Sequence, residues 1–147
     1  MQQAVEADAA LEAAYRSTHY EVQLPDGELL TLRVDVPNPA LQVVQERCGV
    51  SCSAFLTAWN PRSVPQSAEQ NSAANRELQQ RLAALGLECW PGLGRDPGGE
   101  WPPEESLFVP GLELAGASDL GRHFGQNAIL HAAHDGVPRL VWLRAPR

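Results

Sequence analysis

The stretch SAFLTAWNPR, residues 53–62, decides the fold class. Its apolar side chains occupy both faces of an extended chain, because neighbours such as Phe55 and Leu56 point in opposite directions. Such a run is typical of a central strand that is covered on both faces of its sheet. Pro61 ends the strand, because proline cannot donate the hydrogen bond that a central strand needs. The sequence therefore predicts a buried strand over residues 53–59, followed by a loop.

A hairpin is predicted on each side of this strand. Over residues 20–36, apolar and polar residues alternate on both sides of the turn sequence Pro25-Asp26-Gly27. Over residues 128–144, two apolar runs flank Asp135-Gly136, a dipeptide that strongly indicates a tight turn. Pro138 indicates that one strand of this second hairpin lies at an edge of the sheet. Two hairpins predict a sheet that is largely antiparallel.

Four helices are predicted. The first covers residues 3–15, the second begins at Asn38-Pro39, and the last begins at Ser118 and ends at Gly125. The most regular helix covers residues 71–85, and its inward stripe runs through Asn71, Asn75, Leu78, Leu82 and Leu85.

Strands are also predicted over residues 87–91 and 105–109, with a loop rich in glycine and proline over residues 92–103. The mixture of hairpins and helices predicts an α+β fold. We expect a single domain over residues 1–147, with a mostly antiparallel or mixed central sheet and helices packed on it.

Composition excludes some classes of function. The chain of 147 residues has a net charge of −7 and no lysine, and its arginines are scattered, so non-specific nucleic-acid binding is not expected. No run of eighteen apolar residues occurs, so we expect no membrane span. Three cysteines and an acidic start that is unlike a signal peptide favour reduced thiols and a cytoplasmic location.

Familiar catalytic and metal-binding motifs are absent. The sequence contains no phosphate-binding loop, no H-E-x-x-H and no G-x-S-x-G. Cys48 and Cys52 lack a second pair of metal-ligand type, and His131 and His134 are expected on opposite faces of a strand. We therefore expect neither a metal nor a cofactor.

Polar residues gather where the predicted elements begin or end. If these elements are neighbours in the sheet, their side chains converge on one pocket that holds a small ligand of nucleotide type. Amides read hydrogen-bonding edges, Arg62 holds a carboxylate or phosphate, and Glu105 is the candidate general base. The candidate binding residues are Thr57, Asn60, Arg62, Asn71, Asn75, Glu105, Ser106, Gln126 and Asn127.

Two alternatives stay open. The same amides also suit a purely structural role, in which they cap helices and satisfy backbone groups. The chain is alternatively a protein–protein interaction module without catalysis, which uses its acidic surface and the loop around an exposed Trp101. A homodimer through an edge strand of the last hairpin is also compatible with the pattern. Whether the chain is an enzyme is open.

Four sequence pieces in one order support a family resemblance. They are residues 55–62 (FLTAWNPR), Asn71 with Asn75 before the leucine stripe, residues 104–109 (EESLFV) and residues 124–129 (FGQNAI). Together they resemble the bacterial Domain-of-Unknown-Function 3293 family, over about residues 10–143. The family has no assigned activity, so the resemblance implies the extent of the fold and the interest of these polar positions, and no mechanism.

Overall fold

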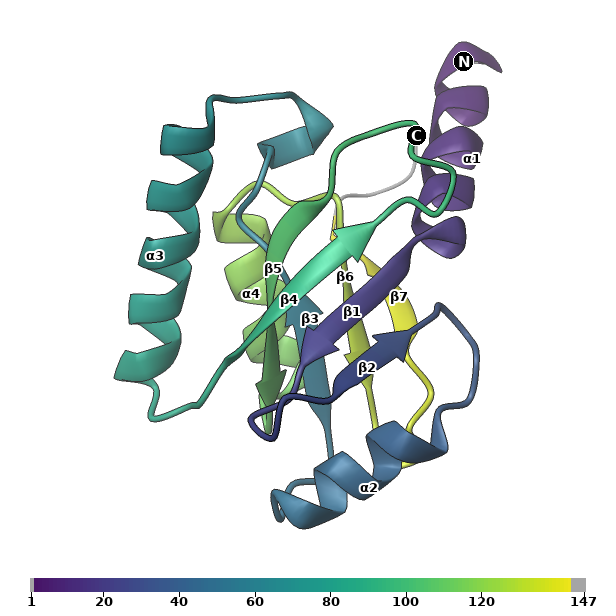
Figure 1. The fold of residues 1–147 in the computed structure, drawn as a ribbon. Coiled ribbons are helices and arrows are strands. Elements are labelled where there is room, and N and C mark those ends of the chain that lie inside the picture. Colours follow the sequence, from purple (N-terminus) through teal and green to yellow (C-terminus); the bar gives the residue numbers. More distant parts are fainter. Residues whose placement is uncertain (1, 144–147) are drawn as a thin grey trace.

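The apolar run after residue 52 forms an inner strand of a seven-stranded sheet in the computed structural model (Figure 1). The structure describes the backbone of residues 2–143 and the side chains of residues 9–143. The elements follow in the order α1 (Gln2–Ser17), β1 (His19–Gln23), β2 (Leu29–Leu32), α2 (Pro39–Arg47), β3 (Ser53–Leu56), the 3-10 turn η1 (Pro61–Ser63), α3 (Ala68–Ala84), β4 (Trp90–Arg95), β5 (Glu104–Pro110), α4 (Leu114–His123), β6 (Ala128–Ala132) and β7 (Arg139–Trp142).

The sheet confirms the predicted α+β class. Its strand order is β2-β1-β4-β5-β3-β6-β7, and every neighbouring pair is antiparallel. Both predicted hairpins form, as β1 with β2 and as β6 with β7. All four residues of β3 are buried between β5 and β6, and β7 lies at an edge, as Pro138 indicated.

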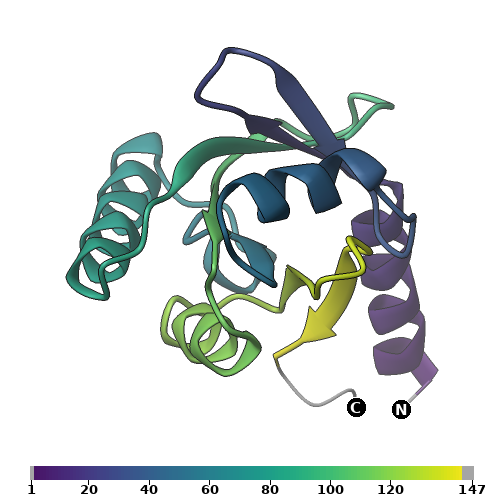
Figure 2. The ribbon, with the colours of Figure 1, turned by 90° about the horizontal axis from the view of Figure 1, so that it is seen from below.

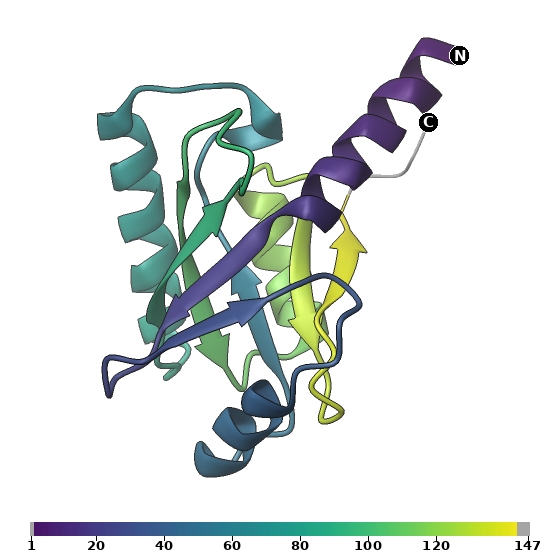
Figure 3. The same ribbon diagram turned by 45° about the vertical axis from the view of Figure 1, so that its right-hand side comes forward.

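The sheet curls until its two edges approach each other. Beyond β2, the N–H of Asp35 donates to the carbonyl of Pro138 at 2.7 Å, and the N–H of Asn38 donates to that of Gly136 at 3.0 Å. Figure 3 shows β1 and β2 lying in front of β3 and β6. Helix α2 lies across the lower end of the curl, as the view from below shows (Figure 2). The sheet therefore has an inner and an outer face, each with its own core.

Alternate residues of each strand belong to different cores. The inner core contains Phe55 and Phe108, together with Tyr20 from β1 and Leu41 from α2. The outer core packs Leu78 and Leu82 of α3, and the apolar side of α4, against alternate residues of β3 and β5, which are Ala54, Leu56, Leu107 and Val109. Because successive strand residues face opposite sides, one apolar run supplies both cores.

The caps of α2 and α3 follow their sequences. Asn38 accepts the N–H of Leu41 at 3.0 Å and so caps α2, as predicted, and Gly49 follows with a φ of 68°. Helix α3 begins earlier than predicted, because Ser67 and Gln70 form a reciprocal capping box.

Three further predictions of secondary structure are wrong. The segment 92–103 is not all loop, because β4 continues to Arg95 and pairs with both β1 and β5. Ser118 does not cap a helix; it is buried inside α4, which begins at Leu114. Leu85 does not continue the inward stripe of α3, since it is 60% exposed beyond the end of the helix.

Glycine explains the first of these errors. A Cβ on Gly92 would lie 2.7 Å from the Phe55 ring and 3.2 Å from the carbonyl oxygen of Glu21. The missing side chain therefore lets the inner-core ring lie directly on β4. The glycine at position 92 is therefore required by tertiary packing, and a segment whose sequence is typical of a loop forms a strand.

Candidate functional site

The segment that follows β3 leaves the sheet through an unusual backbone conformation. Asn60, Arg62 and Ser63 all have positive φ, at 45°, 58° and 61°. Residues other than glycine rarely adopt such angles, and each costs on the order of 1–3 kcal/mol unless the surroundings impose it. The contacts of residues 57–63, named the 57–63 loop below, are therefore the first place to look for constrained side chains.

Asn75 and Thr57 fix the point at which the chain leaves the sheet. The Asn75 Oδ1 accepts the N–H of Ala58 at 2.8 Å, and its Nδ2 donates to the carbonyl of Glu105 at 2.9 Å. The Thr57 hydroxyl donates to the same carbonyl at 2.6 Å and accepts the N–H of Trp59 at 3.0 Å. These bonds take the place of strand pairing, so β3 ends at residue 56 rather than at the predicted residue 59.

Asn71 and Asn60 form a reciprocal pair deeper in the molecule. The Asn71 Oδ1 accepts the backbone N–H of Asn60, and its Nδ2 donates to the Asn60 Oδ1, both at 2.8 Å. The Asn60 Oδ1 also accepts the N–H of Gln66 at 3.0 Å. Asn71 is only 2% exposed, so these contacts satisfy an amide that has no access to water.

The segment before β6 holds the other side of the 57–63 loop. Gln126 donates through Nε2 to the carbonyl of Trp59 at 3.1 Å, and Asn127 donates through Nδ2 to the hydroxyl of Ser63 at 3.1 Å. The backbone N–H of Arg62 donates to the carbonyl of Gly125 at 2.7 Å. The loop is thus held from α3 on one side and from the segment before β6 on the other.

Most of the predicted site residues meet in this hydrogen-bond network, named the amide clamp below. Its side chains bond to the backbone and to one another, which is the structural role considered for them above. Arg62 is exposed, and its side chain makes no hydrogen bond or ion pair within the described part of the chain. The clamp consists of Thr57, Asn60, Asn71, Asn75, Gln126 and Asn127, with the carbonyl of Glu105.

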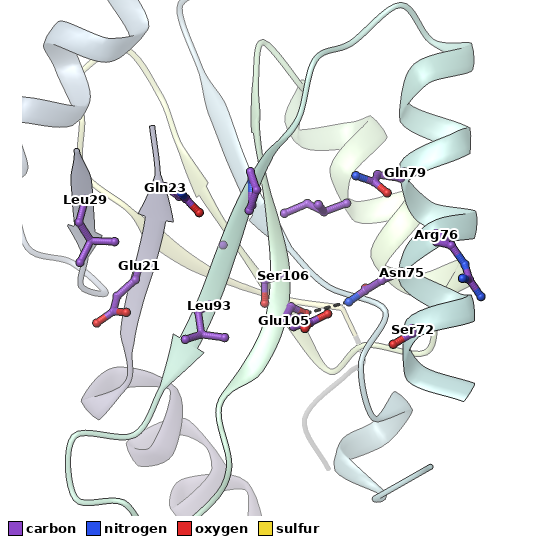
Figure 4. Close-up of a pocket in the computed structure, with 13 residues that line it drawn as sticks. Glu21, Gln23, Leu29, Ser72, Asn75, Arg76, Gln79, Leu93, Glu105 and Ser106 are labelled. Atoms are coloured by element: carbon purple, nitrogen blue, oxygen red, sulfur yellow. Dashed lines mark hydrogen bonds between the residues drawn. The ribbon is translucent and has the colours of Figure 1, made fainter. Parts of the chain in front are cut away.

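An open groove of about 570 Å³ lies beside the clamp, between α3 and the outer face of the sheet (Figure 4). Of the nine predicted residues, only Asn75, Glu105 and Ser106 line it. The Ser106 side chain is buried, and its hydroxyl donates to the carbonyl of Glu104 at 3.1 Å. The α3 groove therefore takes its exposed polar groups mainly from residues outside the predicted set.

The floor of the α3 groove consists of two cross-strand rows. In the first row, Glu21 pairs with Leu93 and Leu93 pairs with Glu105, so one leucine separates two carboxylates. The second row contains Pro91 paired with Leu107. On the helix side, the wall is formed by residues spaced three or four apart, namely Ser72, Asn75, Arg76 and Gln79. The floor is thus apolar along its middle and acidic along one row.

The groove residues were missed for two different reasons. Leu93 lies in the segment that was predicted as a loop, so its pairing with Glu21 and Glu105 could not be predicted. Glu21 was correctly placed on the polar face of the first hairpin, but the pairing of β1 with β4 brings together residues far apart in sequence. The spacing of residues 72, 75, 76 and 79 was a usable signal, because they form one polar face beside the leucine stripe.

The carboxylates at the groove differ in their surroundings. Glu21 forms an ion pair with Arg95, with Oε2 and Nε 3.2 Å apart. Glu105 is exposed, and its carboxylate contacts no cation among the described residues. Its neighbour Glu104 points to the inner face, where burial raises its pKa to about 7. Two consecutive glutamates thus occupy opposite environments.

The thiols and histidines suggest no separate centre. Burial raises the pKa of Cys48, Cys52 and Cys89, which favours the neutral thiol. His131 contacts the carbonyl of Leu112 at 3.0 Å through Nε2. Within residues 9–143, whose side chains the structure describes, no three side chains of His, Cys, Asp or Glu gather in a way that could hold a metal ion. Within residues 2–143, no helix is long and apolar enough to cross a membrane.

Comparison with known proteins gives one finding. No curated protein and no solved structure matches the chain. A family model described as a protein of unknown function, DUF3293, matches residues 56–129, which is half of the chain. The matched stretch runs from the end of β3 to β6, and it contains the whole amide clamp together with α3 and β5. The chain belongs to the DUF3293 family.

Proposed function

We propose that this chain binds a small organic molecule in the α3 groove. The observation that carries the proposal is the groove itself, whose volume of about 570 Å³ falls within the range of small-molecule sites. Leu93 and Leu107 supply apolar surface, and Glu105 and Gln79 supply polar groups beside it. A few polar groups around an apolar floor are the usual composition of such sites.

The amide clamp supports this proposal as a scaffold. Asn75 joins α3 to β5 by bonding the Glu105 carbonyl, so it sets the distance between the helix wall and the sheet floor. We therefore assign Asn75 a positioning role, and we assign Glu105 the direct contact with the ligand. A rigid scaffold behind the groove reduces the entropy lost on binding.

The test is a thermal-shift screen of a broad small-molecule library, with one variant that fills the groove. Ser72→Trp places a large ring at the helix wall, whereas Ala73→Trp places the same ring on the exposed side of α3. A molecule present at a hundred times its Kd stabilises the folded state by about 2.7 kcal/mol. We expect at least one hit that is lost in Ser72→Trp and kept in Ala73→Trp. A hit that both variants keep would place its site outside the groove.

A second candidate, an interaction module, has an observation of its own. Trp101 is 40% exposed in the connection between β4 and β5, whereas Trp90 is buried in the inner core. Exposed tryptophans are frequent anchors of protein interfaces. This candidate needs Trp101 to be in contact with water in the free protein.

Location and self-association remain proposals. The three cysteines are free, which supports a reducing compartment such as the cytoplasm. The edge position of β7 supports a homodimer, but Tyr15 of α1 packs on Trp142 with ring centroids 5.6 Å apart and so covers part of that strand. The molecular mass in solution, measured by light scattering, distinguishes a monomer from a dimer.

A further inference from the structure

The α3 groove carries one unpaired carboxylate, on a residue whose backbone is held in place. The carbonyl of Glu105 accepts hydrogen bonds from both Thr57 and Asn75, so the backbone at this residue is held from two sides. The carboxylate extends from this fixed point toward the helix wall and is exposed (Figure 4). Among the described residues it has no hydrogen-bond or ion-pair partner. An unpaired carboxylate on a backbone that is held in place is suited to a ligand of opposite charge.

The neighbouring carboxylate shows which partner this face of the sheet takes. Glu21 lies two strands away in the same row, about 10 Å from Glu105 by the usual strand spacing. It is only 18% exposed and holds the guanidinium of Arg95 at 3.2 Å. On one side of Leu93, the Glu21 carboxylate is thus already paired with the guanidinium of Arg95. Glu105 lies on the other side of Leu93.

An anionic ligand fits the groove poorly. It would need a free cation, and Arg76 is the sole basic residue among the described lining residues. Arg76 belongs to the wall of the groove, but Figure 4 shows the end of its side chain pointing away from Glu105. Arg95 is engaged by Glu21, and Arg62 does not line the groove. The net charge of −7 further opposes the approach of an anion.

We infer that the α3 groove takes an organic cation, with a primary ammonium or guanidinium head at Glu105 and an aliphatic stem over Leu93 and Leu107. This inference rests on the proposed function and specifies its ligand class. An exposed ion pair strengthens binding by on the order of fivefold at most, so the head alone is not enough. Each methylene buried on the floor is expected to tighten Kd by about fourfold. A simple inorganic cation is therefore not the ligand.

The test is an NMR titration of the isotope-labelled chain with hexylamine, butylamine, hexanol and hexanoate. These probes separate the head group from the stem. We expect hexylamine to shift the backbone amides of Leu93, Glu105 and Leu107, and to bind about sixteenfold more tightly than butylamine, which lacks two methylenes. Hexanol is expected to bind more weakly than hexylamine, and hexanoate is expected not to bind in the groove.

Two variants show whether the charge at Glu105 is responsible. Glu105→Gln keeps the shape of an exposed side chain and is expected to weaken hexylamine binding by about fivefold. Glu28→Gln removes a charge from the exposed turn between β1 and β2, outside the groove, and is expected to leave Kd unchanged. The amide spectrum of each variant reports directly whether it is folded.

The outcomes separate the ligand class from the binding function. Equal binding of hexanol and hexylamine, tight binding of hexanoate, or an unchanged Kd in Glu105→Gln would overturn the cation inference. Each of these results leaves the α3 groove as a small-molecule site. If neither amine binds, but another compound of the library shifts the same backbone amides, then the inferred ligand class is wrong and the proposed function stands. If no compound shifts them, the proposed function fails as well.

Discussion

The amide clamp and the α3 groove are neighbours built from the same kinds of side chain, but they use their polar groups differently. In the clamp, Asn71 bonds to the backbone and side chain of Asn60, and Asn75 bonds to the backbone of Ala58 and of Glu105. In the groove, Glu105 and Arg76 have polar side chains that meet no partner within the described residues. A polar side chain is informative about ligands only when the protein itself leaves its hydrogen-bonding groups unused.

Asn75 and Glu105 connect the two regions. The Asn75 amide belongs wholly to the clamp, although the residue lines the groove, whereas Glu105 gives its carbonyl to the clamp and its carboxylate to the groove. Substitutions in the clamp should therefore change stability, and substitutions in the groove should change binding.

The largest expected effect is that of Asn71→Leu. Leucine has a similar volume but leaves the N–H of Asn60 without an acceptor beside a buried position, and it deprives the Asn60 Oδ1 of one of its two donors. Each unsatisfied buried group costs about 1–3 kcal/mol, so we expect a loss of about 3 kcal/mol in the free energy of unfolding. Urea denaturation measures this loss. Gln80→Leu, on the exposed side of the same helix, is the control and should change stability by less than about 0.5 kcal/mol.

An Asn71→Leu variant with unchanged stability would contradict the contrast between the amide clamp and the α3 groove. It would mean that the 57–63 loop keeps its positive φ angles without the clamp, and that the amides are free for another role. Ser72→Trp, one residue further along α3, sharpens the contrast, since it should fill the groove at little cost in stability.

A smaller effect is expected from Glu104 and depends on pH. Burial raises its pKa from about 4.5 to about 7, so folding favours the neutral acid. The stability contributed by this group is fully present below pH 4.5 and is lost as pH rises toward 7. Because of Glu104, we expect the free energy of unfolding to be on the order of 2 kcal/mol lower at pH 8 than at pH 5. Chemical denaturation at the two pH values measures the difference.

Glu104→Gln isolates this contribution from that of the four histidines. The variant is neutral at both pH values, so its stability should fall less between pH 5 and pH 8 than that of the wild type. Glu105→Gln, the neighbouring exposed residue, should change stability by under about 0.5 kcal/mol at either pH. Identical pH dependence in the wild type and in Glu104→Gln would show that the inner face does not desolvate this carboxyl.

The smallest effect on stability is expected for Trp101→Phe. Because Trp101 is 40% exposed and Trp90 is 9% exposed, acrylamide should quench the first and spare the second. Trp101→Phe should therefore lower the quenchable fraction of the emission, and Trp90→Phe should raise it. Unchanged quenching in Trp101→Phe would count against the interaction module, since its anchor would already be covered in the free protein.

The parts of the fold that could be predicted are those with a local signal. The alternation in β1 and β2, the turn at Asp135-Gly136 and the cap at Asn38 each depend on residues close together in sequence. The strand at Gly92 could not be predicted, because it exists only where the Phe55 ring lies against it. The clamp residues were singled out by their positions at element ends, but the backbone groups to which they bond were not predicted.

The groove was largely beyond prediction for the same reason. Its floor depends on the pairing of β1 with β4, which joins segments about seventy residues apart. No periodicity within either strand reveals which strand lies beside it. Glu105 was identified as a candidate, but the side chains that surround it on its face of the sheet are set by the pairing of β5 with β4.

The 57–63 loop also has a consequence for how the chain folds. The loop is held by α3, by β5 and by the segment before β6, none of which precedes it in the sequence. The loop cannot therefore close until α3, β5 and the segment before β6 have docked. Once it closes, opening any one of these attachments strains the others, so residues 56–129 should open and close together as one cooperative unit.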